Sequence, residues 1–224
     1  MTEAVRILPR LPFWDKLSPE EQAYVRRNAA IRRAPAGQLL YSRDCACVGL
    51  VYVISGMLRI YSLSPEGREI TLFRLGAGEP CVFSASCVVK QISFDTHMSA
   101  QEDSELLVLN AEAFAFITET NVYARCFLFE RAAEDFSSVM RTMESILFEP
   151  FDSRLASFLV AEAQRIGGKE LKLTQSEIAE KVNSAREVVA RMLREFSEKG
   201  LVETRRGTVT ILDINGLKNI SSEM

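Results

Sequence analysis

Residues 173–202 read LTQSEIAEKVNSAREVVARMLREFSEKGLV, and this stretch decides the fold of the C-terminal part. It begins with Thr174-Gln175-Ser176-Glu177, a Thr-x-x-Glu capping box that starts a short helix. Asn183 follows that helix, and asparagine tolerates the left-handed backbone conformation that a sharp turn requires. Ser184-Ala185-Arg186-Glu187 has the pattern of a second capping box, so we expect a second helix to about Lys199. Two short helices joined by so tight a turn predict a helix-turn-helix.

The second helix separates apolar from polar side chains. Its apolar stripe is Val189, Met192, Leu193 and Phe196, and its opposite face carries Glu187, Ala190, Arg191 and Arg194, with Arg186 at the N-terminal end. Arginine can bond two acceptors on guanine, and glutamate can accept from the amino group of cytosine, so this face suits a recognition helix in the DNA major groove. In the alternative interpretation, Glu187 is only the capping acid and Arg194 is a solvated surface residue.

A hairpin is expected after the second helix. Leu201–Thr204 and Thr208–Leu212 are joined through Arg205-Arg206-Gly207, which predicts a wing whose arginines meet phosphate. The predicted DNA contacts are Thr174, Ser184, Arg186, Glu187, Arg191, Arg194 and Arg205. The chain carries a net charge of −3, which excludes a polybasic nucleic-acid coat but leaves room for a local basic patch.

A long helix is expected before this region. Asn121–Leu147 contains no Gly or Pro and repeats apolar residues at alternating spacings of three and four, a coiled-coil pattern. These residues are Phe129, Ala132, Phe136, Val139, Met143 and Ile146. The pattern predicts the interface of a homodimer, while packing of the same stripe on the N-terminal domain is the alternative. Pro150 ends the helix, and another is expected from about Phe151 to Ile166.

The N-terminal half has the pattern of an antiparallel β-sandwich or barrel. After a capped helix that starts at Ser18, short apolar runs alternate with Gly and Pro from about Ile31 to Leu109. Ser64-Pro65-Glu66-Gly67 predicts a tight turn between two of these runs, Met57–Leu63 and Glu69–Leu75. We therefore expect an effector-sensing β-barrel domain over 1–120, a dimerisation helix and hinge over 121–149, and a winged helix-turn-helix domain over 150–224.

Composition argues against an enzyme. The single histidine, His97, rules out a site with several imidazole ligands, and we predict no metal site and no catalytic residue. The five cysteines are Cys45, Cys47, Cys81, Cys87 and Cys126, which contain no Cys-x-x-Cys pair. With no signal-peptide pattern and no apolar stretch long enough for a bilayer, we expect a cytoplasmic protein with reduced thiols and no membrane contact.

The sequence resembles the CRP/FNR family of bacterial transcription regulators. The resemblance covers nearly the whole chain and is strongest at SAREVVAR (residues 184–191), with further support from EGREI (66–70) and LGAGE (75–79). It implies an α+β fold: an N-terminal cyclic-nucleotide-binding-like antiparallel β-barrel (jelly roll), a long dimerisation helix and a C-terminal winged helix-turn-helix. It also implies that Arg186, Glu187 and Arg191 read a TGTGA half-site in double-stranded DNA, and that an activator would contact RNA polymerase.

The residues expected to bind an effector differ from those of the best-known branches of this family. Cyclic-AMP binders carry an Arg-Ser/Thr pair that neutralises the cyclic phosphate, but Phe94 and Asp95 stand in those places, which disfavours cAMP. An FNR-type iron–sulfur cluster is also disfavoured, because no cysteine precedes Cys45 and Leu107 occupies the later position. Haem remains possible through a thiol of residues 80–87 or through His97, although a lone histidine on a strand is usually structural.

The predicted effector pocket is lined by Gly78, Glu79, Cys81, Phe83, Cys87, Phe94, Met98, Val139 and Met140. Such a lining suits an apolar small molecule, a haem or a redox signal, and the sequence does not choose among them. A second class of function stays open: a small-molecule-binding module whose helix-turn-helix serves only protein contacts.

Overall fold

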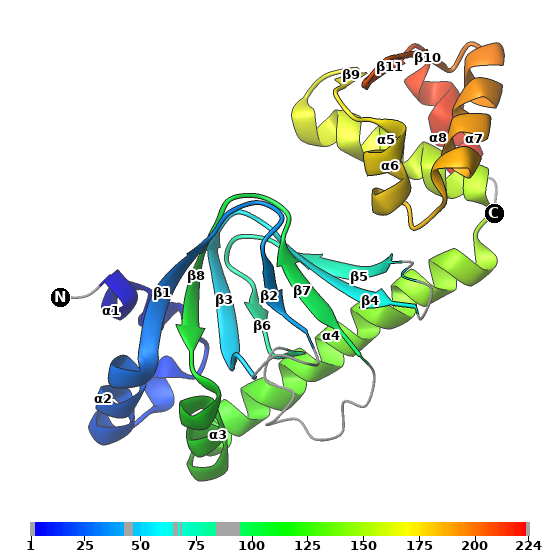
Figure 1. Ribbon diagram of the computed structural model, residues 1–224. Helices are drawn as coiled ribbons and strands as arrows, with labels where there is room; N and C mark the ends of the chain where they lie inside the picture. Colours follow the sequence, from blue (N-terminus) through cyan, green and yellow to red (C-terminus); the bar gives the residue numbers. More distant parts are fainter. Residues whose placement is uncertain (1–2, 43–46, 65–66, 68, 84–94, 223–224) are drawn as a thin grey trace. The chain divides into compact units, whose positions relative to one another are not determined.

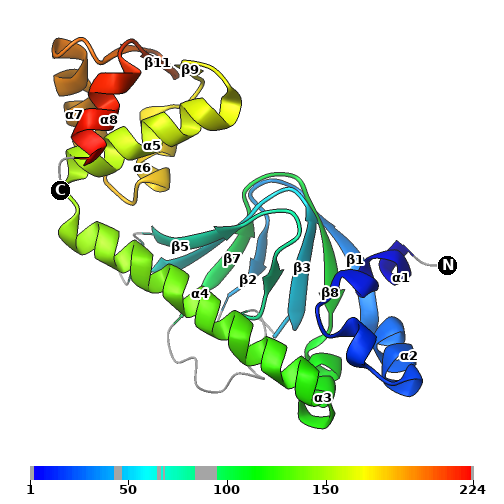
Figure 2. The same ribbon diagram turned by 180° about the vertical axis from the view of Figure 1, so that it is seen from behind.

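The computed structural model describes residues 3–42, 47–64, 67, 69–83 and 95–222. The chain divides into two compact units, residues 1–140 and residues 141–224. Figures 1 and 2 show the sheets of the N-terminal unit and the helices of the C-terminal unit from opposite sides.

Two antiparallel sheets form the body of the N-terminal unit (Figure 1). Within the described residues, one sheet has the strand order β1-β8-β3-β6 and the other the order β2-β7-β4-β5. The strands are β1 Ala29–Ala34, β2 Leu39–Tyr41, β3 Leu50–Ser55, β4 Leu58–Leu63, β5 Glu69–Leu75, β6 Pro80–Cys81, β7 His97–Ala100 and β8 Ser104–Leu109. The expected hairpin is confirmed, since Leu58 pairs with Leu75 and Leu63 with Glu69. The two sheets are jelly-roll-like and are not joined by hydrogen bonds into one closed barrel in this part of the chain.

In the sequence, helices precede the first strand and follow the last strand of these two sheets. They are α1 Glu3–Ile7, the 3-10 turns η1 Leu8–Arg10 and η2 Trp14–Lys16, α2 Pro19–Asn28, α3 Ala111–Thr120 and α4 Val122–Phe148. The predicted capping box of α2 is confirmed: Ser18 Oγ accepts from the Glu21 N–H, and Glu21 Oε2 accepts from the Ser18 N–H. Two hydrophobic rings tie α4 to the N-terminal turns, since the centroids of Phe13 and Phe127 lie 5.1 Å apart.

The C-terminal unit is a helical bundle with a small sheet. Its elements are α5 Phe151–Ile166, β9 Glu170–Leu171, α6 Gln175–Lys181, α7 Arg186–Glu198, β10 Val202–Arg205, β11 Thr208–Ile211 and α8 Ile214–Ser222. The strands pair antiparallel in the order β10-β11-β9, which confirms the predicted wing and adds a third strand to it.

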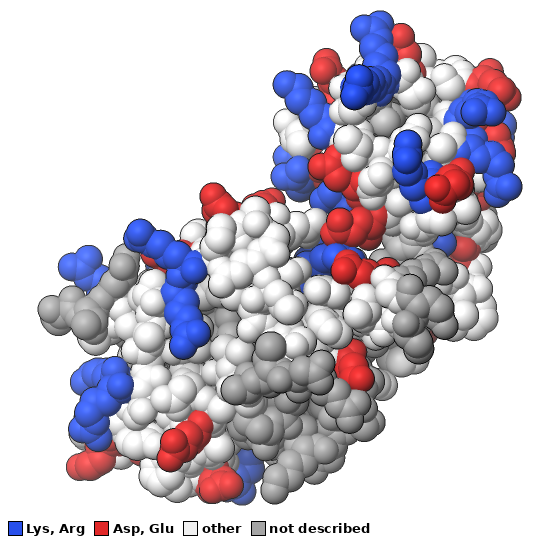
Figure 3. Space-filling model, in the orientation of Figure 1, with Lys and Arg blue, Asp and Glu red and all other residues white. Residues whose placement is uncertain are grey.

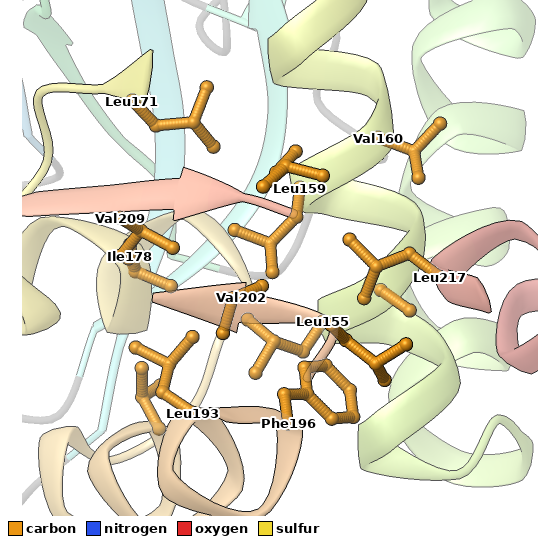
Figure 4. Close-up of a cluster of buried hydrophobic side chains, with 14 of the residues drawn as sticks. Leu155, Leu159, Val160, Leu171, Ile178, Leu193, Phe196, Val202, Val209 and Leu217 are labelled. Carbon is orange, nitrogen blue, oxygen red and sulfur yellow. The ribbon is translucent and has the colours of Figure 1, made fainter. Parts of the chain in front are cut away.

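One apolar core holds all of these C-terminal elements together (Figure 4). Leu155 and Leu159 from α5, Val189 and Phe196 from α7, and Leu217 from α8 are at most 1% exposed. Burying a large apolar side chain contributes roughly 1.5–3 kcal/mol, so this core determines how α6, α7 and the wing are oriented.

The described residues can be compared with two expectations, reduced cysteine thiols and the lack of a membrane-spanning helix. Cys81 and Cys126 are not disulfide-bonded, but Cys47 is, so the expectation of reduced thiols is wrong at Cys47. The odd number and irregular spacing of the cysteines gave no signal for this bond, because disulfide pairing depends on distance in the fold. In this part of the chain no helix combines the length and the apolar character that a bilayer span needs.

Candidate nucleic-acid interface

The first helix of the motif starts as its sequence predicts. Thr174 Oγ1 accepts from the Glu177 N–H at 3.2 Å, and Glu177 Oε2 accepts from the Thr174 N–H at 2.7 Å. The Thr174 hydroxyl also donates to Glu177 Oε2 at 2.7 Å, and the two hydrogen bonds that the Thr174 N–H and hydroxyl donate to this carboxylate hold the pKa of Glu177 below its usual value. Glu177 therefore stays ionised at the N-terminus of α6, where the helix dipole favours a negative charge.

The turn into the second helix is tight. Asn183 has φ +52°, the left-handed conformation that its identity predicts. The Ser184 N–H donates to the Ala179 carbonyl oxygen at 2.9 Å, and the N–H groups of Val188 and Val189 both donate to the Ala185 carbonyl oxygen at 3.1 Å. Ala185 is therefore the N-cap of α7, and the prediction that Ser184 caps this helix is wrong. The bond to Ala179 places Ser184 in the turn, one residue too early to cap.

Helix α7 presents its charged face to solvent. Val189, Leu193 and Phe196 are at most 1% exposed and anchor the helix on the core. Arg186, Glu187, Arg191 and Arg194 are all exposed, as predicted. Among the described residues, the side chains of these four make no hydrogen bond or ion pair. The helix is thus rigidly held, while its polar side chains are available to an external partner.

A groove of about 460 Å³ lies between the start of α7 and the wing. It is lined by Leu173, Thr174, Gln175, Ser176, Arg186, Leu193, Thr204, Arg205, Arg206, Gly207, Thr208 and Val209. The groove brings together the predicted contacts Thr174, Arg186 and Arg205, which are far apart in the sequence. Gln175 and Ser176 were not among the predicted contacts, whereas Arg206 was expected, together with Arg205, to meet phosphate as a wing arginine.

The predicted dimer stripe on α4 divides between two faces. Phe129 and Phe136 are 57% and 54% exposed. Val139 is only 9% exposed in the single chain, so it lies on the face that packs on the N-terminal unit and offers little surface to a second chain. Ala132, Met143 and Ile146 are half-buried. A 3.5-residue repeat cannot show this division, because both faces of α4 are apolar.

The predicted effector residues also divide. Cys81, Phe83 and Met98 are at most 3% exposed and line the interior of the N-terminal unit with Val139. Gly78 and Glu79 instead lie in an exposed turn between β5 and β6, where Glu79 Oε2 accepts from the Gly76 N–H at 2.6 Å. Their assignment to the pocket stays a prediction, and in this structure the Glu79 side chain is hydrogen-bonded within its own turn. Met140 is exposed, and Cys87 and Phe94 lie outside the described residues.

A buried ion pair next to Cys81 was not anticipated. Asp135 on α4 is 0% exposed, and its Oδ1 accepts from Arg131 Nε at 2.8 Å and from Arg131 Nη2. Burial raises the pKa of Asp135 to about 6, whereas Arg131 and the Val82 N–H lower it and Glu134 raises it. The sequence signal was the i,i+4 spacing of Arg131 and Asp135, which does not distinguish a buried pair from a solvated one.

His97 is placed on β7, as expected, with its ring stacked on Tyr61 at a centroid distance of 5.1 Å. Its Nδ1 is buried and has no hydrogen-bond partner among the described residues. In the same part of the chain, no group of three or more His, Cys, Asp or Glu side chains is arranged to hold a metal ion. The ring contact with Tyr61 is a packing role for His97, and it supplies no second ligand for a haem.

Comparison with known proteins assigns both units. A model of the Crp-like helix-turn-helix domain matches residues 153–220, and a model of the cyclic nucleotide-binding domain matches residues 31–121. The solved structure of a transcriptional regulator of the CRP/FNR family from Eubacterium rectale is 37% identical and superposes with a TM-score of 0.90. That match covers 95% of this chain and 99% of the other.

More distant relatives show the same fold with different named effectors. The cyclic AMP receptor protein of Thermus thermophilus is 25% identical over 210 residues, which cover 94% of this chain and 96% of that protein. The c-di-GMP-responsive regulator CLP of Xanthomonas campestris is 20% identical with a TM-score of 0.68, covering 88% of this chain and 100% of the other. The expected α+β architecture is confirmed, while the effector varies among proteins that share it.

Proposed function

Because the chain belongs to the CRP/FNR family of transcription regulators, we propose that it binds a palindromic TGTGA-like operator as a homodimer, under the control of a small-molecule or redox signal. Membership makes it a transcription regulator with a DNA-binding helix-turn-helix and a cyclic nucleotide-binding domain. The operator, the dimer and the signal are the proposed part. A protein with this function works where the chromosome is, in the cytoplasm, and as an activator it would contact RNA polymerase.

The observation that carries the operator is the free, exposed face of α7. Arg186, Glu187 and Arg191 stand on a helix anchored by Val189 and Leu193, so their side chains can reach base edges without breaking an existing bond. Arginine suits guanine and glutamate suits cytosine, the bases that distinguish TGTGA from an A·T run.

Fluorescence anisotropy on a labelled TGTGA…TCACA duplex tests this function. Arg186→Ala and Arg191→Ala are each expected to weaken binding by about 1–3 kcal/mol, the value of a bidentate base contact. Arg165→Ala is the matched control, because Arg165 is an exposed arginine of α5 that pairs with Glu162 at 2.6 Å and lies outside the groove.

Unchanged affinity in both base-reading variants would overturn the operator assignment. Wild-type affinity that does not fall as salt rises would overturn DNA binding itself and favour a small-molecule-binding module whose helix-turn-helix contacts protein.

The exposed apolar side chains of α4 support the dimer. Phe129 and Phe136 leave more than half of their surface in water, a cost that a second copy of the helix would remove. A two-fold dimer would place two α7 helices about 34 Å apart, one turn of DNA. Phe136→Glu is expected to give monomers in analytical ultracentrifugation, whereas Glu130→Lys on the same helix controls for a change of charge.

The interior of the N-terminal unit supports an effector other than cAMP. Phe83 fills part of this interior, and the Arg131 guanidinium near Cys81 is paired with Asp135, so an anionic phosphate would meet an apolar ring and a cation that is already paired. An absorbance spectrum of protein purified without oxygen tests for haem or an iron–sulfur cluster. Calorimetric titration with cAMP is expected to show no binding at concentrations that saturate a cAMP-dependent regulator.

A further inference from the structure

The groove beside α7 has the lining of a DNA-backbone contact. Gln175 and Ser176 supply amide and hydroxyl donors on one side, beside Thr174, whose hydroxyl donates to Glu177, and the wing forms the other side. Side chains of these types commonly bond phosphate oxygens in protein–DNA complexes. When α7 lies in the major groove of DNA, the DNA strand whose backbone borders that major groove must run along this groove of the protein.

The wing then lies on the far side of that strand. Arg205 pairs with Thr208 at the end of the hairpin, so the loop itself is only Arg206 and Gly207. Gly207 has φ +74°, a conformation that permits this short turn without strain. On the far side of a strand that borders the major groove lies the minor groove, and a two-residue tip is narrow enough to face into it.

The two arginines of the wing differ in their surroundings. Arg205 and Glu203 are two residues apart on β10 and therefore lie on the same face, where Arg205 Nη2 is 3.0 Å from Glu203 Oε1. Arg206 is exposed and makes no hydrogen bond or ion pair within the described residues. The Glu203 carboxylate opposes a close approach of Arg205 to phosphate, whereas no acid of the described residues is paired with Arg206.

We propose that Arg206 enters the minor groove that flanks the half-site and gives this regulator a preference for A·T-rich flanking sequence. This inference rests on the proposed DNA binding. A·T tracts have a narrow minor groove with enhanced negative potential, which attracts an inserted guanidinium more strongly than a wider G·C groove does. The preference acts outside the palindrome, at base pairs that α7 does not reach.

The test uses two duplexes that share one palindrome and differ only in flanks of A·T or G·C. With the full-length protein at fixed salt, the wild type is expected to bind the A·T-flanked duplex about fivefold more tightly, the lower end of what one base-pair change costs. Arg206→Ala is expected to bring the ratio near one. Arg206→Lys should retain part of the ratio, because an ammonium is more strongly hydrated than a guanidinium. Arg165→Ala is the matched control, because Arg165 lies on α5 outside the groove, and it should keep the wild-type ratio.

The outcomes separate this inference from the proposed function. Equal loss of affinity for both duplexes in Arg206→Ala would make Arg206 a phosphate contact and overturn the inference. A wild-type ratio of one, with TGTGA-dependent binding retained, would also overturn it and leave the proposed function standing. Absence of any TGTGA preference in the wild type would overturn both.

Discussion

In the N-terminal unit, Asp135 is withdrawn from water and bound to Arg131, whereas in the C-terminal unit Arg186, Arg191 and Arg206 are exposed and unpaired among the described residues. Figure 3 shows that charged side chains of both signs crowd the visible face of the C-terminal unit, whereas on the N-terminal unit they are separated by white areas. A buried charge requires its partner, and both partners lie on α4, where Arg131 and Asp135 are four residues apart. An exposed, unpaired arginine contributes little to folding, and so its charge is free to bind an anion.

The largest effect is expected when the cation of the buried pair, Arg131, is removed. Arg131→Met keeps most of the side-chain volume but leaves the Asp135 carboxylate unpaired, so the unfolding free energy at pH 7.5 is expected to fall by about 3 kcal/mol. Urea denaturation followed by circular dichroism measures this. Arg191→Met is the control from the other unit and should change stability by about 0.5 kcal/mol or less. Equal effects in the two variants would contradict the contrast.

The buried pair should also make stability depend on pH. Asp135 has its pKa raised from 3.8 to about 6, so the folded chain binds more protons than the unfolded chain between these values. The contribution of Asp135 is therefore present below about pH 4 and is lost as the pH rises through 6, by about 3 kcal/mol in all. We expect the unfolding free energy of the wild type minus that of Asp135→Asn to fall across this interval. A difference that stays flat would refute the raised pKa.

Among the exposed arginines of α7, Arg194 can contact either phosphate or a base, and the two roles predict different measurements. If Arg194 contacts phosphate, Arg194→Ala should reduce the slope of log affinity against log salt by about 1 and weaken binding equally on all sequences. If it reads a base, the slope should hold while discrimination at one position of the half-site falls. Stability should be unchanged in either case, and anisotropy titrations at several salt concentrations decide between the two roles.

The smallest expected effect concerns Glu203. Glu203→Gln removes the acid that pairs with Arg205 and releases a cation at the wing, so DNA affinity is expected to rise by less than about 1 kcal/mol. The unfolding free energy should stay within about 0.5 kcal/mol, because the ion pair is exposed. A fall in affinity would mean that Glu203 itself takes part in recognition.

Local sequence signals succeeded where the cause is local. The capping boxes at Ser18 and Thr174, the left-handed Asn183 and the exposed face of α7 all follow from residues within a few positions of one another. The capping pattern at Ser184 gave a wrong prediction, although the cause is also local. The Ser184 N–H donates to the Ala179 carbonyl oxygen, which places Ser184 in the turn, and Ala185 is the N-cap of α7 without a side-chain hydrogen bond.

By itself, the sequence determined the order of elements, the helix-turn-helix and the arginines that face outward, because periodicity and capping depend on neighbours along the chain. Only the tertiary structure decided which apolar residues of α4 are buried in the same chain, and that Asp135 is buried with Arg131 beside Cys81. It also decided that Arg186 and Arg206 line one groove. These facts depend on contacts between distant segments, and such contacts form only when the sheets and the helical core pack.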